Sequence, residues 1–305
     1  MQFSIIIPAK NEERNISLCL EALRGQCFSS DNFEVIVVDN GSTDGTVSVV
    51  ESLGGQVYIK PEFSISGLRN FGASVSSGDI LIFLDADCLP ESDWLNNAAT
   101  TLVDNQIGCT GSTPVAPENG TWVEMVWSSF RTRRTNKCYT SWINSSNFIV
   151  RRELFDKVNG FNEDVKTCED VDICMRLNKI CKILFDPSIR VTHLGEPKTI
   201  KQFFLKEIWR GKGSISGIIS HGISVSEIKS IMLPVYYLIS SFSLVIAIMI
   251  LAHKYIILFS FLYLLPALIF TIWVVSSTRK INFFFGYFVL FLVYANARTV
   301  ALFSR

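Results

Sequence analysis

The sequence predicts an α/β fold, with a mostly parallel sheet flanked by helices, followed by apolar helices that could cross a membrane. First, short β-branched runs alternate with helical patterns up to about Ile200, which is typical of sheets whose crossovers are helices. Second, Ile231 to Leu251 and Tyr255 to Val275 contain no charged residue. Each is long enough to cross a hydrocarbon layer of ~30 Å.

The predicted elements of the first part follow from periodicity and from turn residues. Phe3 to Pro8 contains three consecutive isoleucines and is predicted as the first strand. Asn11 to Leu23 places Ile16, Leu20 and Leu23 on one helical face, and Gly25 ends the helix. The next predicted elements are a strand at Val35–Asp39, a helix at Thr46–Leu53, a strand at Val57–Ile59, a helix at Ser66–Ser77 and a strand that begins at Leu81.

The alternation continues past that strand and then loosens. Pro90 is predicted to begin a helix that ends at Val103, because its missing N–H would be unpaired in a first turn anyway. Beyond Ile107 the pattern is weaker, with strand-like runs at Asn147–Val150 and Ile189–Thr192. Ligands bind at the carboxyl ends of the strands in open α/β sheets. We therefore expect the catalytic face at that edge and a second substrate site in this looser half.

Composition excludes several classes of protein. The chain has 305 residues, 49% of them hydrophobic, and a mean hydropathy of +0.32. Lys+Arg and Asp+Glu each number 28, so the net charge gives no reason to expect a nucleic-acid partner. The eight Cys contain no Cys-x-x-Cys pair, and we interpret them as reduced cytosolic thiols rather than as a zinc site.

An acid pair carries the strongest chemical signal. The apolar run from Leu81 to Leu84 ends in Asp85 and Asp87. Residues i and i+2 of an extended chain point to the same side. Both carboxylates could therefore bind one hard cation, or one could bind the cation while the other contacts a ligand of that cation. This geometry predicts a metal-bound diphosphate. A phosphatase, with an Asp nucleophile, is the alternative, but Leu89 stands where that pattern has Thr.

Acids also follow two other predicted strands. Glu12 lies in the first turn of the first helix, where it could simply complement the helix dipole. Asp39 precedes a Gly-rich turn, which could accept base or ribose hydrogen bonds or be a tight turn with a helix cap. Arg69 lies on the helix before the acid pair, where its guanidinium could reach a diphosphate; a solvated surface Arg is the alternative.

The second half offers a candidate base and a candidate ligand. Glu169 and Asp170 open a predicted helix, where acids often only complement the dipole. At a helix start that faces a cleft, such a carboxylate could instead deprotonate an acceptor hydroxyl. His193 follows the last strand-like run and could be a further metal ligand, a phosphate contact or a structural residue.

Together these motifs resemble the inverting family 2 glycosyltransferases with a GT-A fold. The resemblance extends from Phe3 to about Gly213. The matching segments are Ile-Ile-Pro-Ala-Lys-Asn-Glu (6–12), Val-Asp-Asn-Gly-Ser-Thr-Asp-Gly-Thr (38–46), Gly-Leu-Arg-Asn-Phe-Gly (67–72), Asp-Ala-Asp (85–87), Ser-Asn-Phe-Ile-Val-Arg-Arg (146–152), Val-Asn-Gly-Phe-Asn-Glu (158–163) and Glu-Asp-Val-Asp (169–172).

The resemblance implies a role for each matched position. Pro8, Ala9, Glu12 and Asp39 would hold the nucleoside, and Arg69 would lie near the phosphates. Asp85 and Asp87 would form the motif for Mg²⁺ or Mn²⁺ and the nucleotide. Asp170 would be the base, with Glu169 beside it and Asn147 on the acceptor side. The implied partners are a nucleotide-sugar donor and a lipid-linked or glycan acceptor.

Departures from related patterns narrow the function. Processive polysaccharide synthases carry a Gln-x-x-Arg-Trp box, whereas here Trp209 precedes Arg210 and no Gln is present. Polyprenyl-phosphate sugar synthases also have C-terminal membrane hairpins, but their phosphate acceptor needs no strong base. The Glu169–Asp170 pair therefore favours a hydroxyl acceptor. A membrane-tethered nucleotide-sugar binder without turnover is the alternative from another class.

The distribution of charge predicts the arrangement in the membrane. We expect a catalytic domain at 1–200, an amphipathic interfacial segment at 201–230 and a membrane domain at 231–305. The segment from Ile281 to Phe303 is a third candidate span, interrupted by Asn296 and Arg298. Lysine and arginine lie mainly outside the predicted hairpin, which places the catalytic domain in the cytoplasm of a multi-pass cell-membrane protein.

Overall fold

The computed structural model describes residues 1–165, 167–221, 225–250 and 253–304, with side chains omitted at 212–231. The chain divides into two compact units that are interleaved in sequence. The first unit comprises 1–117 and 134–195, and the second comprises 118–133 and 196–305. Residues 118–133 therefore belong with the C-terminal part of the chain, whereas the sequence analysis placed them in the catalytic domain.

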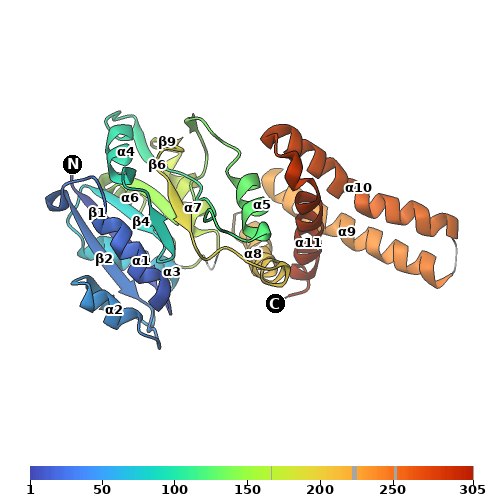
Figure 1. Cartoon of the computed structure of the whole chain (residues 1–305), viewed down its shortest axis with the longest axis horizontal. Helices are drawn as coiled ribbons and strands as arrows, with labels where there is room; N and C mark the ends of the chain where they lie inside the picture. Colours follow the sequence, from blue (N-terminus) through green and yellow to red (C-terminus); the bar gives the residue numbers. More distant parts are fainter. Residues whose placement is uncertain (166, 222–224, 251–252, 305) are drawn as a thin grey trace. The chain divides into compact units, whose positions relative to one another are not determined.

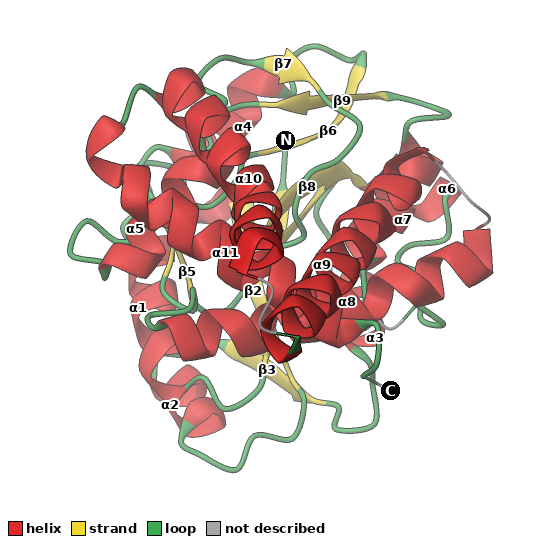
Figure 2. Ribbon diagram, turned by 90° about the vertical axis from the view of Figure 1, so that its right-hand side faces the viewer, coloured by secondary structure: helices red, strands yellow, loops and turns green. Residues whose placement is uncertain are grey.

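The first unit is built on a mixed, mostly parallel sheet in the order β3-β2-β1-β4-β8-β6-β9-β7. Figure 2 shows β3 and β7 at opposite ends of this sheet. The neighbours β3, β2, β1 and β4 are parallel, and β8 is antiparallel to both β4 and β6. The strands are β1 (Phe3–Ala9), β2 (Phe33–Asp39), β3 (Gln56–Ile59), β4 (Ile80–Leu84), β6 (Ile107–Gly111), β7 (Cys138–Tyr139), β8 (Asn147–Arg151) and β9 (Lys182–Phe185).

Two short strands form a separate antiparallel ribbon, β5 (Cys88–Pro90) with β10 (Val191–His193). The prediction that Pro90 begins a helix is therefore wrong. Pro90 is the last residue of β5, and the helix that follows, α4, begins at Trp94. The ribbon ends in His193, opposite Cys88, so an element that the sequence did not predict positions a candidate metal ligand.

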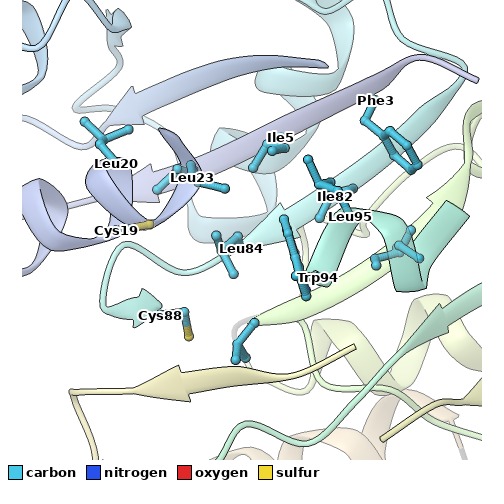
Figure 3. Close-up of a cluster of buried hydrophobic side chains, with 14 of the residues drawn as sticks. Phe3, Ile5, Cys19, Leu20, Leu23, Ile82, Leu84, Cys88, Trp94 and Leu95 are labelled. Carbon is cyan, nitrogen blue, oxygen red and sulfur yellow. The ribbon is translucent and has the colours of Figure 1, made fainter. Parts of the chain in front are cut away.

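Helices cover both faces of the large sheet. They are α1 (Glu13–Arg24), α2 (Thr46–Ser52), α3 (Ile65–Val75), α4 (Trp94–Thr101), α6 (Arg152–Lys157) and α7 (Glu169–Leu177). Side chains alternate across β4: Ile82 joins a cluster that includes α1 and α4, whereas Phe83 joins one that includes α6 and α7. Figure 3 shows the first of these clusters, in which Trp94 and Leu95 lie near Ile82 and Leu84. The sheet is thus buried on both faces, which explains its uninterrupted apolar strands.

The second unit is helical. It contains α5 (Trp122–Arg131), α8 (Ile200–His221), α9 (Val225–Met249), α10 (His253–Thr278) and α11 (Phe284–Ala301), with a short 3₁₀ turn at Ile281–Phe283. Within the described part of the chain, three helices are long and apolar enough to span a membrane: Met232–Met249, His253–Thr278 and Ile281–Ala301. In Figure 1, α9 and α10 run side by side. The third candidate is the least apolar, with a mean hydropathy of 1.4 against 2.0 and 2.3 for the first two.

The predicted interfacial segment 201–230 overlaps α8. Residues 222–224 and the side chains of 212–231 lie outside the described part of the chain. At the start of α8, Phe203 is buried against side chains of α5 and α11. Glu207 is 1% exposed and accepts hydrogen bonds from Arg210 and from Arg298 of α11. Arg298, which interrupts the apolar pattern, thus pairs with a carboxylate inside the same unit.

Candidate active site

The ends of β1, β2 and β4 bring the first set of candidate residues together. The register pairs Ala9 with Asp39, and β4 ends one residue before Asp85. Pro8 and Ala9 are buried, and the Ala9 carbonyl accepts the Asn40 N–H at 2.8 Å. The three strand ends thus lie at one edge of the sheet, as the sequence predicts for parallel strands.

Asp39 shapes the loop behind this edge. Its side chain is fully buried, and it accepts hydrogen bonds from the Ser42 N–H, at 2.8 Å, and from the Ser42 hydroxyl. The same hydroxyl oxygen accepts the N–H of Asn11, whose φ is 55°. The turns after β1 and β2 are therefore tied to each other. Ser42 was not singled out by the sequence analysis, although Asn-Gly-Ser signals the turn.

Glu12 lies in the turn after β1, close enough to Asp85 and Asp87 for their charges to affect it. Its carboxylate accepts the Asn15 side-chain N–H at 2.6 Å. Burial raises the pKa of Glu12, and the nearby Asp87 and Asp85 carboxylates raise it further. Burial also raises the pKa of Asp85, with Asp87 adding to the effect and Arg69 opposing it. Several like charges in one place favour the binding of a cation.

Arg69 connects the two halves of the site. Its guanidinium lies 3.1 Å from Asp85 and 2.8 Å from Glu169, and the residue is only 2% exposed. The Phe161 ring lies beneath it at 5.4 Å, and Ser145 donates a second hydrogen bond to Glu169. The surface alternative for Arg69 is excluded, because a buried guanidinium between two carboxylates is held in a single geometry.

The acid pair and the last strand place ligand-type atoms together. His193 Nε2 lies 3.1 Å from Asp87 Oδ1. The ligand-type atoms of Asp87, Cys88 and His193 all lie within 4.8 Å of one another. A Cβ at Gly195 would lie only 1.9 Å from Asp87 Oδ2, so any larger residue would displace this carboxylate from its present position. A carboxylate and an imidazole this close together suit the binding of a divalent cation.

Asp170 lies at the start of α7, beside Glu169. Cys168, at the N-cap, has a φ of 65°, and the Val171 N–H donates to the Asp170 carboxylate at 2.8 Å. Burial, followed by repulsion from Glu169, raises the pKa of Asp170 to about 6, against opposing contributions from Arg69 and a Trp142 hydrogen bond. A carboxylate tuned toward neutral pH suits proton abstraction.

Asn147, which was expected on the acceptor side, lies in the core of the first unit. Its side chain is fully buried, and its Oδ1 accepts the indole N–H of Trp94 at 3.0 Å. Its amide N–H groups donate to Ser112 Oγ and to the Ile189 carbonyl, at 3.0 and 2.8 Å. The amide thus ties β8 to α4 and to the chain before β10. The motif was recognised, but its polar side chain points into the core.

A mostly parallel sheet, with an acid-x-acid pair at its strand ends and a buried arginine beside them, defines a GT-A nucleotide-sugar transferase domain. The chain is similar in fold to the mannosyltransferase PcManGT from Pyrobaculum calidifontis, solved with GDP-Man and Mn²⁺. The TM-score is 0.57, at 21% identity over 75% of this chain and 67% of that one.

Sequence comparison gives the family. The family model described as "Glycosyl transferase family 2" matches residues 4–158, just over half of the 305-residue chain. The chain therefore belongs to this family of glycosyltransferases. It is 29% identical to the glycosyltransferase AglE of Haloferax volcanii over 75% of this chain and 78% of that protein. A shorter stretch, 32% of this chain, is 33% identical to a dolichyl N-acetyl-α-D-glucosaminyl phosphate glucuronosyltransferase of Methanococcus voltae, covering 33% of that protein.

Proposed function

We propose that this protein is a membrane-anchored inverting glycosyltransferase that moves a sugar from a nucleoside-diphosphate donor to a hydroxyl of a lipid-linked glycan. The observation that supports this most is the position of Asp170. It is a half-buried carboxylate whose pKa is raised to about 6, and it lies next to the Arg69–Glu169 pair. A phosphate acceptor, already an anion, would not need such a base.

The donor side is assigned to the strand-end residues. Asp87 and His193 would hold Mg²⁺ or Mn²⁺, which stabilises a diphosphate leaving group when it is bound. Asp85 holds Arg69, whose guanidinium adds positive charge near the departing phosphates. Glu12 and the loop fixed by Asp39 would bound the nucleoside, with Pro8 and Ala9 at the base of that site. Because the leaving group is stabilised by charge, no general acid is required.

The acceptor side is assigned to Asp170. Its carboxylate takes the proton of the acceptor hydroxyl as the oxygen attacks the sugar carbon from the face opposite the diphosphate. The new carbon–oxygen bond forms as the bond to the diphosphate breaks, which inverts the anomeric centre without a covalent enzyme intermediate. Glu169, held by Arg69 and Ser145, acts as a positioning residue for the start of α7.

The membrane role rests on the apolar helices. Three candidate spans would keep the enzyme beside a greasy acceptor while a soluble donor arrives from the cytoplasm. Lys229 before the first span and Arg279–Lys280 after the second outnumber Lys254 in the loop between them, which favours a cytoplasmic catalytic domain in a multi-pass cell-membrane protein. The relative from Methanococcus voltae, named for a dolichyl-linked acceptor, supports a lipid-linked glycan.

The test uses the full chain purified in detergent. It is incubated with Mn²⁺, a membrane lipid extract and labelled nucleotide sugars supplied one at a time, and label is followed into the organic phase. We expect a lipid-linked product whose new bond survives mild acid. Chelator should abolish transfer and added Mn²⁺ should restore it in wild-type protein. Asp87→Asn should weaken that rescue, and Asp164→Asn, a change of an exposed acid, serves as the matched control.

Other outcomes distinguish the alternatives. An acid-labile sugar on lipid phosphate would identify a polyprenyl-phosphate sugar synthase and overturn the assignment of a hydroxyl acceptor. Saturable binding of a nucleotide sugar, without incorporation from any donor into any lipid fraction, would favour the non-catalytic binder. Transfer that is indifferent to chelator would remove the metal role of Asp87 and His193.

A further inference from the structure

Cys88 lies between two residues assigned to the cation. It follows Asp87 directly, and the antiparallel register of β5 and β10 places it opposite His193. Residues directly opposite each other in an antiparallel pair point to the same face. The Cys88 Sγ lies 4.0 Å from Asp87 Oδ1, and all three ligand-type atoms fit within 4.8 Å. Backbone pairing therefore directs the thiol and the imidazole toward the same region.

The backbone around these residues is fixed on both sides. The Cys88 N–H donates to the Asp85 carbonyl at 3.0 Å, and the Leu194 N–H donates to the Asp87 carbonyl at 2.8 Å. The close passage of Gly195 confines the other side of the Asp87 carboxylate. The three ligand-type groups are thus held by a turn and a ribbon, a geometry that can be prepared before any ion binds.

An ordinary buried cysteine would be a small apolar residue of the core. Cys88 is fully buried and shares a cluster with Leu84 and Trp94, as Figure 3 shows. Cys19 is another cysteine of that cluster, but it is not among the three grouped ligand-type residues. What sets Cys88 apart is its place between a carboxylate and an imidazole, at a site where a cation is already required.

We propose that Cys88 is a third protein ligand of the cation in this transferase, so that the site prefers a borderline transition-metal ion to Mg²⁺. The inference rests on the proposed function for the cation itself, but not on the choice of acceptor. Thiolate and imidazole ligands favour ions such as Co²⁺ and Zn²⁺, whereas Mg²⁺ prefers oxygen ligands alone. As the metal–sulfur bond forms, the Cys88 thiol releases its proton to solvent.

The first test needs no substitution. The full chain in detergent is loaded with Zn²⁺ alone, and X-ray absorption at the zinc edge reports the ligand atoms. We expect one sulfur at ~2.3 Å together with nitrogen and oxygen ligands at ~2.0–2.2 Å. A zinc shell that contains only nitrogen and oxygen would overturn the role of Cys88.

The second test assigns that sulfur to a residue. With Co²⁺ alone, thiolate ligation produces an intense near-ultraviolet charge-transfer band, which oxygen and nitrogen ligands lack. We expect the band in wild-type protein and in the control Cys109→Ser, a buried cysteine of the other core cluster. In Cys88→Ser the band should disappear and Co²⁺ affinity should fall at least ~10-fold.

A band that persists in Cys88→Ser, in protein with an unchanged melting temperature, would refute the proposal. If Cys88→Ser does not fold, Cys88→Ala takes its place in the Co²⁺ measurement, and a zinc shell without sulfur in wild-type protein would still overturn the proposal. These readouts are independent of sugar transfer. A sulfur ligand in a protein that transfers no sugar would therefore sustain this inference while the proposed function failed, and the reverse result would separate them equally well.

Discussion

The guanidinium of Arg69 lies 2.8 Å from the carboxylate of Glu169, 100 residues further along the chain. The same guanidinium contacts Asp85, so one side chain connects the edge of the sheet assigned to the donor with the helix that carries the candidate base. Because it is buried, displacement of one partner alters the electrostatic environment of the other. If the proposed donor and acceptor assignments hold, this arginine couples the two substrate sites.

Arg69→Lys is expected to impair both stability and activity. A lysine keeps the charge but cannot reproduce a planar fork between two carboxylates, and a buried group left unpaired costs about 1–3 kcal/mol. The melting temperature in detergent and the rate of transfer should both fall. Arg190→Lys is the matched control, because Arg190 and Glu91 form a pair at the surface that is about half exposed. Equal effects of the two changes would contradict this reasoning.

Asp170→Asn is expected to reduce transfer by about 10²–10⁴-fold, the usual contribution of general base catalysis. The asparagine has a similar size but cannot accept the acceptor proton. Binding of the nucleotide sugar, measured by calorimetry, should change little. Asp164→Asn should retain full activity. Transfer at the wild-type rate by Asp170→Asn would eliminate this residue as the base.

The pH dependence of transfer should show the ionisation of Asp170. Its pKa is raised to about 6 by burial and by Glu169, and only the ionised carboxylate can accept a proton. The rate should therefore fall as the pH drops below about 6 and level off above it. This acidic limb should be lost from the residual activity of Asp170→Asn. The same limb in both proteins would assign the titration to another group.

Asn147→Ala tests whether the amide is structural. The change leaves the Trp94 indole N–H without its acceptor, whereas the Ser112 hydroxyl still donates to the Ile189 carbonyl. We expect a loss of stability of about 1–3 kcal/mol for the buried indole left unpaired, with an unchanged acceptor KM in the folded fraction. Asn105→Ala, at an exposed position, is the control. A raised acceptor KM at normal stability would restore the acceptor-side role.

Gly195→Ala should weaken the cation site. The added Cβ would lie 1.9 Å from Asp87 Oδ2, so the carboxylate must rotate away from His193. The Mn²⁺ concentration that gives half-maximal activity should rise, while the melting temperature changes little because only one side chain moves. Gly54→Ala is a useful control for backbone effects, since its Cβ would meet no atom within 4 Å, although its φ is positive. An unchanged Mn²⁺ requirement in Gly195→Ala would refute the constraint on Asp87.

Periodicity was sufficient for the parallel half of the fold. β1, β2 and β4 are rich in isoleucine, valine and leucine, and residues at their carboxyl ends meet because parallel strands end at one edge. The Pro90 error arose because a proline suits a first helical turn and the end of a short strand equally well. The pairing of β5 with β10 joins residues about 100 positions apart, and local patterns hold no information about such a contact.

The sequence predicted which types of residue form the candidate site, but not which of them contact each other. Acids at strand ends and at the start of α7 were identified from the sequence. The placement of Arg69 between Asp85 and Glu169, and the proximity of Cys88 to His193, depend on tertiary geometry. The direction of a side chain also decided the case of Asn147. A sequence motif can show where a strand lies without showing which face of the sheet each side chain points to. A shift of one residue moves a polar side chain such as Asn147 from one face to the other.

The interleaving of the two units affects how this enzyme can be divided. Residues 118–133 lie between the two parts of the catalytic unit, yet they fold with the C-terminal helices. Within that second unit, α5 buries Val123 and Val126 in a cluster with Tyr287 and Leu290 of α11. No single break in the polypeptide therefore separates the catalytic unit from the helical unit. A form cut after Gly195 would keep α5 without the helices that it packs against, and a chimaera that exchanges the C-terminal helices would need to exchange residues 118–133 with them.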